Sequence, residues 1–217
     1  MSYDSTIIER FRKLATASVA DAVDKVAGQR GYMQYEIKPR AGSHKIVGPA
    51  ATVLEGPTEE PQPPKHALDM IDESDAGTVL VIGVGGERDV AVWGGLMTAG
   101  AVANRLAGAV LDAGVRDVSE IERDFDFTVY ARTVSPGTTV GRYRTLDKDV
   151  PVDCGGVTVH PSDLIVADRD GVVVVPQAHV DGVLEMAEDI ERKEAEQTRF
   201  ILETGSLREG LAKYDRI

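Results

Sequence analysis

The stretch that decides the fold runs from Gly83 to Glu120 and reads GVGGERDVAVWGGLMTAGAVANRLAGAVLDAGVRDVSE. An apolar run at residues 79–82 precedes its glycine turn, and a second apolar run follows at 109–111; both are typical of buried strands. Small residues between the two runs predict a helix from about Trp93 to Leu106. Two strands with a crossover helix form a βαβ unit, which holds anions and metals at its strand ends and helix N-termini.

The start of this helix is suited to binding a carboxylate. Its first residues, Gly94, Gly95, Leu96 and Met97, expose backbone N–H groups that have no partner within the helix. Glycine at 94 and 95 lets a ligand approach the main chain without interference from a Cβ atom. The same two glycines equally suit close packing of helix against strand, so the pattern alone leaves both interpretations open.

The end of the second strand carries an arginine, an aspartate and a glutamate. Arg116 offers a planar, permanently charged fork for a carboxylate or an enolate oxygen. Asp117 offers a hard oxygen ligand for Mg²⁺ or Mn²⁺, and Glu120 follows at i+3 on the same side of a helical turn. The alternative is that Arg116 and Asp117 pair with other groups and that Asp117 caps the next helix.

The remaining pattern predicts one layered α/β domain over residues 1–217, with a long C-terminal helix. One or two helices are expected at 5–27, and further helices at 65–71, 118–123 and 177–203, followed by a short final one that Ser206 opens. Strands are expected at 46–54, 127–132, 139–143, 157–160, 164–167 and 172–175. The mixed, basic segment 30–45 predicts a loop, and the proline-rich segment 56–64 predicts an irregular link.

Composition narrows the class of protein. With 36 acidic and 24 basic residues, the formal charge is −12, which argues against a nucleic-acid partner because phosphate binding needs clustered Lys and Arg. No apolar run reaches membrane-spanning length, and the charged N-terminus is typical of neither a signal nor a transit peptide. The single cysteine, Cys154, excludes an internal disulfide and fits a cytoplasmic location. The four histidines, at positions 44, 66, 160 and 179, show no metal-ligand spacing.

The central motif resembles the signature of the RraA-like family: Gly95, twenty residues, Arg116-Asp117, two residues, then Glu120. The segments LATASVADAVD, AGAVLDAGVRDVSEI and PSDLIVADRDGVVVVP also resemble family segments, and they occur in the family's order. The family includes 4-hydroxy-4-methyl-2-oxoglutarate (also 4-carboxy-4-hydroxy-2-oxoadipate) aldolases and the regulator of ribonuclease E activity A. Some members formerly carried the label demethylmenaquinone methyltransferase.

The resemblance implies a swivelling β/β/α-type domain that assembles as homotrimers or hexamers with active sites at subunit interfaces. In the aldolase branch, the backbone matching Gly94 to Met97 and the matching Arg116 bind the pyruvyl part of the substrate. Asp117 matches the position that holds Mg²⁺ or Mn²⁺, largely through waters, and Glu120 matches a residue that supports that shell. The regulator branch lacks the aspartate, so Asp117 favours the catalytic branch.

These residues imply a metal-dependent lyase that cleaves a 4-hydroxy-2-keto diacid to pyruvate and a second keto acid. The same pyruvate enolate implies oxaloacetate decarboxylation. The alternative is a non-catalytic inhibitor that binds a ribonuclease. A methyltransferase is disfavoured, because the glycine turn after residue 82 lacks the acidic ribose partner that a nucleotide-type site requires. Gly95 is a departure, since some aldolase members carry an acidic residue there.

Overall fold

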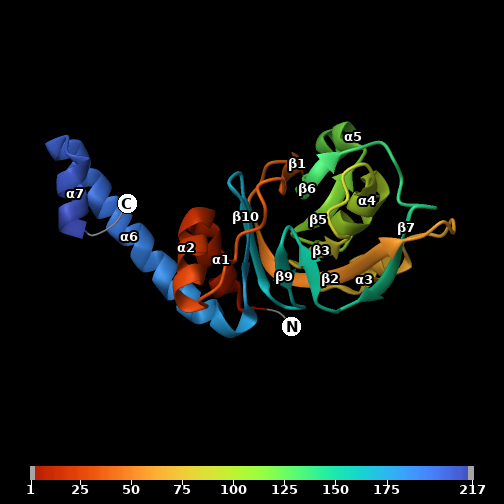
Figure 1. The fold of residues 1–217 in the computed structure, drawn as a ribbon, viewed down its shortest axis with the longest axis horizontal. Helices are drawn as coiled ribbons and strands as arrows, with labels where there is room; N and C mark the ends of the chain where they lie inside the picture. Colours follow the sequence, from red (N-terminus) through yellow and green to blue (C-terminus); the bar gives the residue numbers. More distant parts are fainter. Residues whose placement is uncertain (1–2, 215–217) are drawn as a thin grey trace.

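A mixed β-sheet forms the centre of the molecule, and helices cover it on two sides (Figure 1). The structure is a computed structural model that describes residues 3–214. The strands of the sheet are β1 (Lys38–Ala41), β2 (Ile46–Pro57), β3 (Val79–Gly83), β4 (Ala91–Trp93), β5 (Gly108–Val115), β6 (Val129–Val134), β7 (Tyr143–Lys148), β10 (Leu164–Asp168) and β11 (Gly171–Val175). A two-stranded hairpin consists of β8 (Val152–Cys154) and β9 (Val157–Val159).

Two groups of helices pack against the sheet. The helices are α1 (Ser5–Lys13), α2 (Thr16–Val26), α3 (Lys65–Glu73), α4 (Gly95–Ala103), α5 (Val118–Asp124), α6 (Val180–Thr204) and α7 (Leu207–Tyr214), with a 3₁₀ turn at Gln177–His179. Apolar residues of α3, α4 and α5 share one core cluster with strands β2, β3 and β5. Residues of α1, α2 and α6 share another with β10 and β11. Each group therefore buries its apolar stripe on its own side of the sheet.

The sheet is nearly closed. Its strand order is β1-β6-β5-β3-β2-β10-β11, with β4 paired to β5 and β7 paired to β2. A backbone bridge between Tyr32, which precedes β1, and Val173 of β11 brings the two ends of that order together. A third core cluster fills the interior, and the β8–β9 hairpin contributes Val152, Cys154 and Val157 to it. The near closure accounts for the uninterrupted burial of β3 and β5, which have covered faces on both sides.

The predicted α/β class, the central βαβ unit and the long C-terminal helix are confirmed. Strands β3 and β5 pair in parallel and α4 crosses between them. The helix is shorter than the predicted span of 93–106, because Ala91–Trp93 instead forms β4 against β5. The N-terminal pattern, which predicts one or two helices, forms two, α1 and α2, and Ser206 precedes the predicted final helix.

Three local predictions were wrong. The expected loop at 30–45 contains β1, which is stabilised by antiparallel pairing with β6 rather than by its own short sequence pattern. The expected strand at 139–143 is a turn, since the N–H groups of Arg142 and Tyr143 both donate to the Thr139 carbonyl and Gly141 has a φ of +76°. The expected link at 56–64 starts two residues late, because β2 continues to Pro57.

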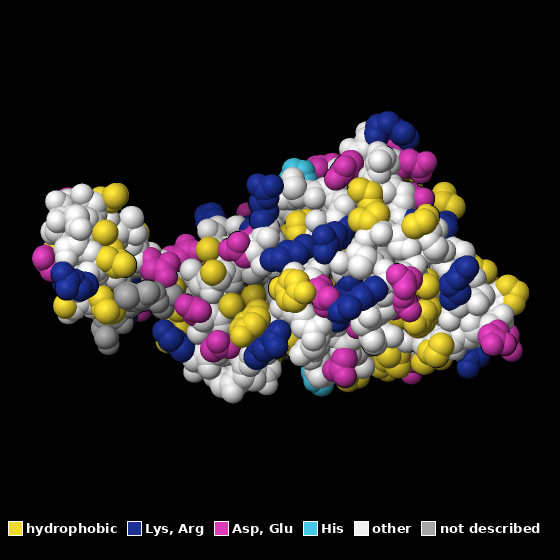
Figure 2. All heavy atoms as spheres, turned by 45° about the horizontal axis from the view of Figure 1, so that its top comes forward, with side chains coloured by type: hydrophobic (Ala, Val, Ile, Leu, Met, Phe, Trp, Pro, Cys, Tyr) yellow, Lys and Arg dark blue, Asp and Glu magenta, His cyan; other side chains and the backbone are white. Residues whose placement is uncertain are grey.

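The C-terminal part of α6 and helix α7 extend away from the sheet as a helical hairpin (Figure 1). Gly205, with a φ of +69°, reverses the chain between the two helices. Hydrophobic side chains are visible on this outlying lobe in Figure 2, and the exposed leucines of the hairpin are Leu202, Leu207 and Leu211. Within residues 3–214, no helix combines the length and apolar character that a membrane crossing requires.

A buried ion pair ties the sheet to three neighbouring segments. Arg132 of β6 contacts Asp112 of β5 at 2.6 Å, and both side chains are almost fully buried. Asp112 also accepts hydrogen bonds from the N–H groups of Gly85, Gly86 and Gly155, so both of its oxygens are satisfied. Arg132 further donates to the side chains of Gln34 and Glu36 before β1.

Replacing Asp112 with asparagine is expected to lower the free energy of unfolding by about 3 kcal/mol, because the buried Arg132 charge loses its buried counter-ion and keeps only the partly exposed Glu36. Urea unfolding of Asp112→Asn measures this. The matched control is Glu188→Gln, which changes an exposed, two-contact pair with Arg10 and is expected to cost about 1 kcal/mol or less. Equal losses in the two variants would contradict a structural role for the buried pair.

Candidate functional site

The glycines of the central motif and the Arg116-Asp117 pair line one cavity of about 200 Å³. It lies where β4 and β5 end and where α4 and α5 begin. The remaining lining comes from the start of α3 and from the turn before β7. The lining residues are Pro64, Leu68, Ala91, Val92, Trp93, Gly94, Gly95, Leu96, Met97, Arg116, Asp117, Thr138, Thr139 and Val140.

Gly94 and Gly95 contact the Arg116-Asp117 pair directly. The N–H of Gly95 donates to Oδ2 of Asp117 at 3.0 Å. A Cβ atom at Gly94 would lie 2.6 Å from that same oxygen and 3.1 Å from Cγ of Arg116. Glycine at 94 is thus required for the close approach, whereas a Cβ atom at Gly95 would make only ordinary contacts of 3.5 Å or more.

Asp117 has an uncommon backbone conformation. Its φ of 60° and ψ of 27° lie in the left-handed region, which aspartate tolerates better than most residues. It occupies the N-cap position of α5, but its side chain makes no capping hydrogen bond and turns toward Gly95 instead. Arg116 lies beside it, with Nε 3.5 Å from Oδ2, and both side chains remain partly exposed. The capping alternative therefore does not account for this carboxylate.

The buried Trp93 fixes the position of the arginine. Its carbonyl accepts the N–H of Arg116 at 3.0 Å, which joins the end of β4 to the end of β5. Its indole stacks on Phe127 with ring centroids 6.1 Å apart and donates to the hydroxyl of Thr98 in α4 at 2.8 Å. Strand, helix start and arginine are thus held as one rigid unit around the cavity.

The start of α4 retains free hydrogen-bonding capacity. The first N–H groups of a helix have no carbonyl partner within it, and the N-cap residue of α4, Gly94, has no side chain to bond them. The Gly95 N–H is used by Asp117, while the next two residues, Leu96 and Met97, line the cavity. An anion bound here would face helix N–H groups, the positive end of the helix dipole and the Arg116 guanidinium.

Asp117 and Glu120 both lie close to Gly95, although Glu120 is not among the residues that line the cavity. A Cβ atom at Gly95 would lie 3.5 Å from Oε2 of Glu120 and 3.7 Å from Oδ2 of Asp117. Among the described residues, no group of three or more His, Cys, Asp or Glu side chains could enclose a metal. Two hard carboxylates beside an open cavity nevertheless fit Mg²⁺ or Mn²⁺, because such ions keep several waters and take further oxygens from the substrate.

Glu55 is a buried carboxyl group behind the cavity that the sequence interpretation missed. It is 3% exposed, and its Oε2 lies 3.4 Å from the hydroxyl of the lining residue Thr139. Its Oε1 is buried without a hydrogen-bond partner. Burial raises the pKa of Glu55 to about 7, and the Thr139 hydrogen bond only partly offsets this. The available signal was an acidic residue in the otherwise apolar run IVGPAATVLEG.

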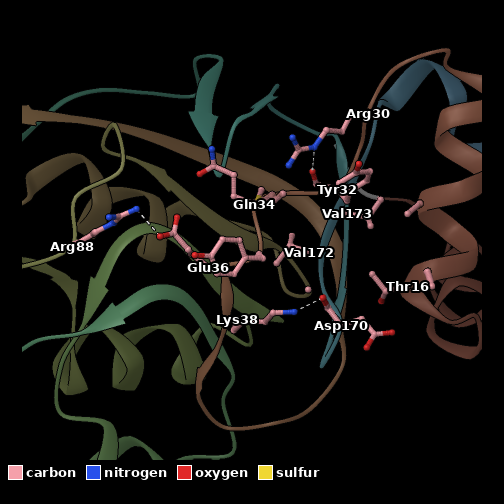
Figure 3. Close-up of a pocket in the computed structure, with 15 residues that line it drawn as sticks. Thr16, Arg30, Tyr32, Gln34, Glu36, Lys38, Arg88, Asp170, Val172 and Val173 are labelled. Atoms are coloured by element: carbon pink, nitrogen blue, oxygen red, sulfur yellow. Dashed lines mark hydrogen bonds and ion pairs between the residues drawn. The ribbon is translucent and has the colours of Figure 1, made fainter.

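A larger cavity of about 700 Å³ lies elsewhere, between α2, β11 and the segment before β1 (Figure 3). Its basic side chains already have partners within the chain: Arg88 pairs with Glu36, Lys38 donates to the carbonyl of Asp170, and Arg30 donates to the carbonyl of Tyr32. Tyr35 at its rim is 82% exposed. None of the predicted site residues lines this cavity, so we assign the site to the smaller one.

Cys154 and the histidines add no group to the cavity lining. Cys154 is fully buried, and burial raises the pKa of its thiol well above the usual value, which disfavours the reactive thiolate. His66 comes nearest in the chain, because it lies between the lining residues Pro64 and Leu68 at the start of α3. Its Nδ1 is buried without a hydrogen-bond partner.

Comparison with known proteins places the chain in a family. A family model described as Aldolase/RraA matches residues 16–174. A Halalkalibacterium halodurans protein named "putative 4-hydroxy-4-methyl-2-oxoglutarate aldolase" is 30% identical over 197 residues, which cover 89% of this chain and 88% of that protein. Protein DlpA of Legionella pneumophila is 31% identical over 179 residues, which cover 82% of this chain but only 29% of DlpA.

Solved structures share the same fold. An uncharacterised protein from Pseudomonas syringae pv. tomato superposes with a TM-score of 0.84 at 28% identity, covering 97% of this chain and 98% of the other. Streptomyces coelicolor RraAS2, described as an unusual member of the RNase ES inhibitor RraA family, superposes with a TM-score of 0.80 at 24% identity, over 90% and 96% of the two chains. The chain belongs to the RraA-like family, as its central motif predicts.

The two glycines are expected to respond differently to an added methyl group. Gly94→Ala crowds the side chains of Asp117 and Arg116, which must shift, and is expected to cost about 1–3 kcal/mol of unfolding free energy. Gly95→Ala has room at the first position of α4 and is expected to be neutral or to stabilise by up to about 1 kcal/mol. Urea unfolding compares the two; an equal response would refute the close approach at Gly94.

Burial of Glu55 predicts a pH-dependent stability. Its folded pKa of about 7 exceeds its ordinary value of 4.5, so the folded state binds more protons between these limits and loses stability as pH rises. The stability that wild type loses between pH 4.5 and about 7 amounts to about 3 kcal/mol. Unfolding free energies of wild type and Glu55→Gln are measured from pH 5 to 8. As the pH rises, the value for wild type is expected to fall relative to that for Glu55→Gln, which lacks this titrating group. The control Glu122→Gln, at an exposed position, should follow wild type at every pH.

Proposed function

We propose that the protein is a divalent-metal-dependent lyase that cleaves a 4-hydroxy-2-keto diacid to pyruvate and a second keto acid. In this proposal the same pyruvate enolate also permits decarboxylation of oxaloacetate. The main support for this proposal is that the helix start at residues 94–97 lines the same cavity as Arg116 and Asp117. The name of the Halalkalibacterium relative supports the aldolase class.

The chain's own residues supply the binding groups that this reaction requires. The substrate carboxylate binds at the start of α4, where helix N–H groups and the helix dipole favour an anion. Arg116, held by the Trp93 carbonyl, binds the keto-acid oxygens and stabilises the negative charge that develops on the enolate oxygen. The hydrogen bond to Trp93 fixes the backbone of Arg116, and Asp117 lies beside its guanidinium, with Nε 3.5 Å from Oδ2.

Asp117 and Glu120 would hold the Mg²⁺ or Mn²⁺ ion, with waters completing its coordination. When bound, the ion supplies Lewis-acid polarisation of the 2-keto group. Asp117 keeps its side chain toward the cavity because of its left-handed backbone and the Gly95 N–H. The absence of an acidic side chain at Gly95 leaves room between the two carboxylates, which favours a different substrate or water arrangement from members that carry one.

We also propose a homotrimer or hexamer in which the cavity lies at a subunit interface. Three large apolar side chains that line it are substantially exposed: Leu68 at 40%, Leu96 at 91% and Val140 at 40%. Exposed apolar groups beside a binding cavity are typical of surfaces that another chain covers. Light scattering coupled to size-exclusion chromatography measures the assembly directly.

The competing function is a non-catalytic inhibitor that binds a ribonuclease, the class to which the Streptomyces structure is assigned. A protein of that class has no chemical requirement for a metal-binding carboxylate beside Arg116. The Asp117 side chain makes no capping hydrogen bond to α5 and lies at the cavity instead, which supports the catalytic alternative.

The decisive measurement is pyruvate release from 4-hydroxy-4-methyl-2-oxoglutarate and from oxaloacetate, with Mg²⁺ and then with EDTA. Wild-type protein is expected to release pyruvate only with metal. Asp117→Asn and Arg116→Lys are each expected to lower kcat/KM by about 100-fold or more. The first removes the carboxylate charge that would hold the metal, and the second removes the planar fork that would bind the keto-acid oxygens.

The matched control is Asp124→Asn, which makes the same chemical change at the other end of α5, where the carboxylate is exposed and pairs with Arg123. It is expected to retain wild-type activity. Release that survives EDTA would contradict the metal-dependent mechanism. No release from either substrate by the metal-loaded protein would contradict the aldolase assignment and favour the ribonuclease inhibitor.

A further inference from the structure

We propose that Glu55 is the proton store of the Arg116-Asp117 cavity and exchanges its proton with bound substrate through the Thr139 hydroxyl. This inference rests on the proposed lyase function and names a group that the central motif does not contain. Glu55 acts through Thr139 and is therefore a positioning residue for the proton rather than a group that touches the substrate.

The first argument is the placement of Glu55. It lies near the end of β2, on the face that also carries Ala51 and Val53, and these two residues belong to the apolar core under α3 and α4. Burying a carboxyl group in such a core costs several kcal/mol unless it is neutral or fully hydrogen-bonded. Here one oxygen has no hydrogen-bond partner among the described residues, and the other has only Thr139.

The second argument is the geometry of Thr139. Its Oγ1 lies 3.4 Å from Oε2 of Glu55 and 3.4 Å from the carbonyl of Tyr143. A hydroxyl has one proton, so it can donate to only one of these acceptors at a time. When Glu55 is protonated, it can donate to Thr139 while Thr139 donates to Tyr143 or to a ligand. When Glu55 is ionised, Thr139 donates to Glu55, so the hydroxyl direction follows the protonation state. Hydrogen bonds between catalytic groups are often longer in the free protein than in the substrate complex.

The charged and titratable groups near Glu55 are few. On β7, Thr145 is its register partner, and the phenol of Tyr143 is held by Glu87 at 2.6 Å. On α3, His66 donates its backbone N–H to the hydroxyl of Thr145. β3 contributes no ionisable side chain, and Arg116 and Asp117 belong to the cavity on the far side of Thr139. No cation forms an ion pair with Glu55 among the described residues, so burial dominates its pKa of about 7.

The reaction needs one group that accepts a proton and later returns it, and it needs no other reactant. In cleavage, the C4 hydroxyl loses its proton, the C3–C4 bond breaks, and its electron pair moves to C2 and the keto oxygen as the enolate. The hydroxyl becomes the carbonyl of the second keto acid. That proton passes through Thr139 to the Glu55 carboxylate and returns by the same route to C3, which yields pyruvate. A group with a pKa near 7 is half-protonated at neutral pH and can both accept and return the proton.

The test begins with the protein alone. Wild type and Glu55→Gln are labelled with ¹³C at the glutamate carboxyl and titrated by NMR from pH 5 to 9. One carboxyl resonance is expected to titrate near pH 7 in wild type and to be missing from the variant. If no glutamate carboxyl titrates above pH 6, Glu55 holds no exchangeable proton in the working range and the proposal is overturned.

The second readout is exchange of the pyruvate methyl protons in D₂O with Mg²⁺, which reports enolate formation without a full aldol substrate. Glu55→Gln and Thr139→Val are each expected to slow exchange about 100-fold or more, with little change in the KM for pyruvate. Glu55→Asp is expected to restore part of the rate. Wild-type exchange is expected to rise with pH through about 7, and Glu55→Gln is expected to lack this rise.

The matched control is Thr52→Val, which removes a buried hydroxyl from the same strand, where it donates to Val150 rather than facing the cavity. It is expected to keep the wild-type rate and pH profile. If Glu55→Gln exchanges the pyruvate methyl protons at the wild-type rate, this proposal is overturned and the lyase function is unaffected. A wild-type protein that exchanges no pyruvate protons overturns both.

Discussion

The Asp112–Arg132 ion pair is the interaction on which the architecture around the cavity depends. It lies inside a sheet that is covered on both sides, and its hydrogen bonds reach the turn after β3, the β8–β9 hairpin and the segment before β1. A buried charge pair stabilises a fold only when its remaining donors and acceptors are also satisfied. Those backbone N–H groups meet that condition, and they fix β5 four residues before the site arginine.

From that fixed strand, the site follows from two local backbone constraints. Gly94 has no side chain at the point where Asp117 approaches to 2.6 Å of its would-be Cβ. Asp117 adopts a left-handed conformation, which costs free energy and persists only where the surroundings impose it. Together the two place a carboxylate, a guanidinium and the start of a helix within one cavity of about 200 Å³.

The sequence predicted those parts of the fold that are encoded locally. The apolar runs around the glycine turn give a βαβ unit, and parallel strands with a crossover helix bring a helix start and a strand end to the same edge. For that reason Gly94 and Arg116 could be named together from a single stretch. The segment Lys38–Ala41 could not be recognised as a strand, because pairing with β6 defines it. Thr139 was assigned to a strand, since its turn depends on hydrogen bonds that no pattern displays.

The sequence pattern did not identify Glu55 for a related reason. Its proposed role depends on its burial in the folded protein, and residue spacing does not reveal burial. Asp117 and Glu120 are both exposed to solvent, and Asp117 lines the cavity. Glu55 lies behind the cavity wall in an apolar core, where the neutral form is favoured. In the proposed reaction the two carboxyl groups have different roles, because Asp117 would hold the metal ion and Glu55 would gain and lose a proton. Glu55 contacts Thr139, which lines the same cavity as Asp117, so the proposed proton route depends on where the fold places β2.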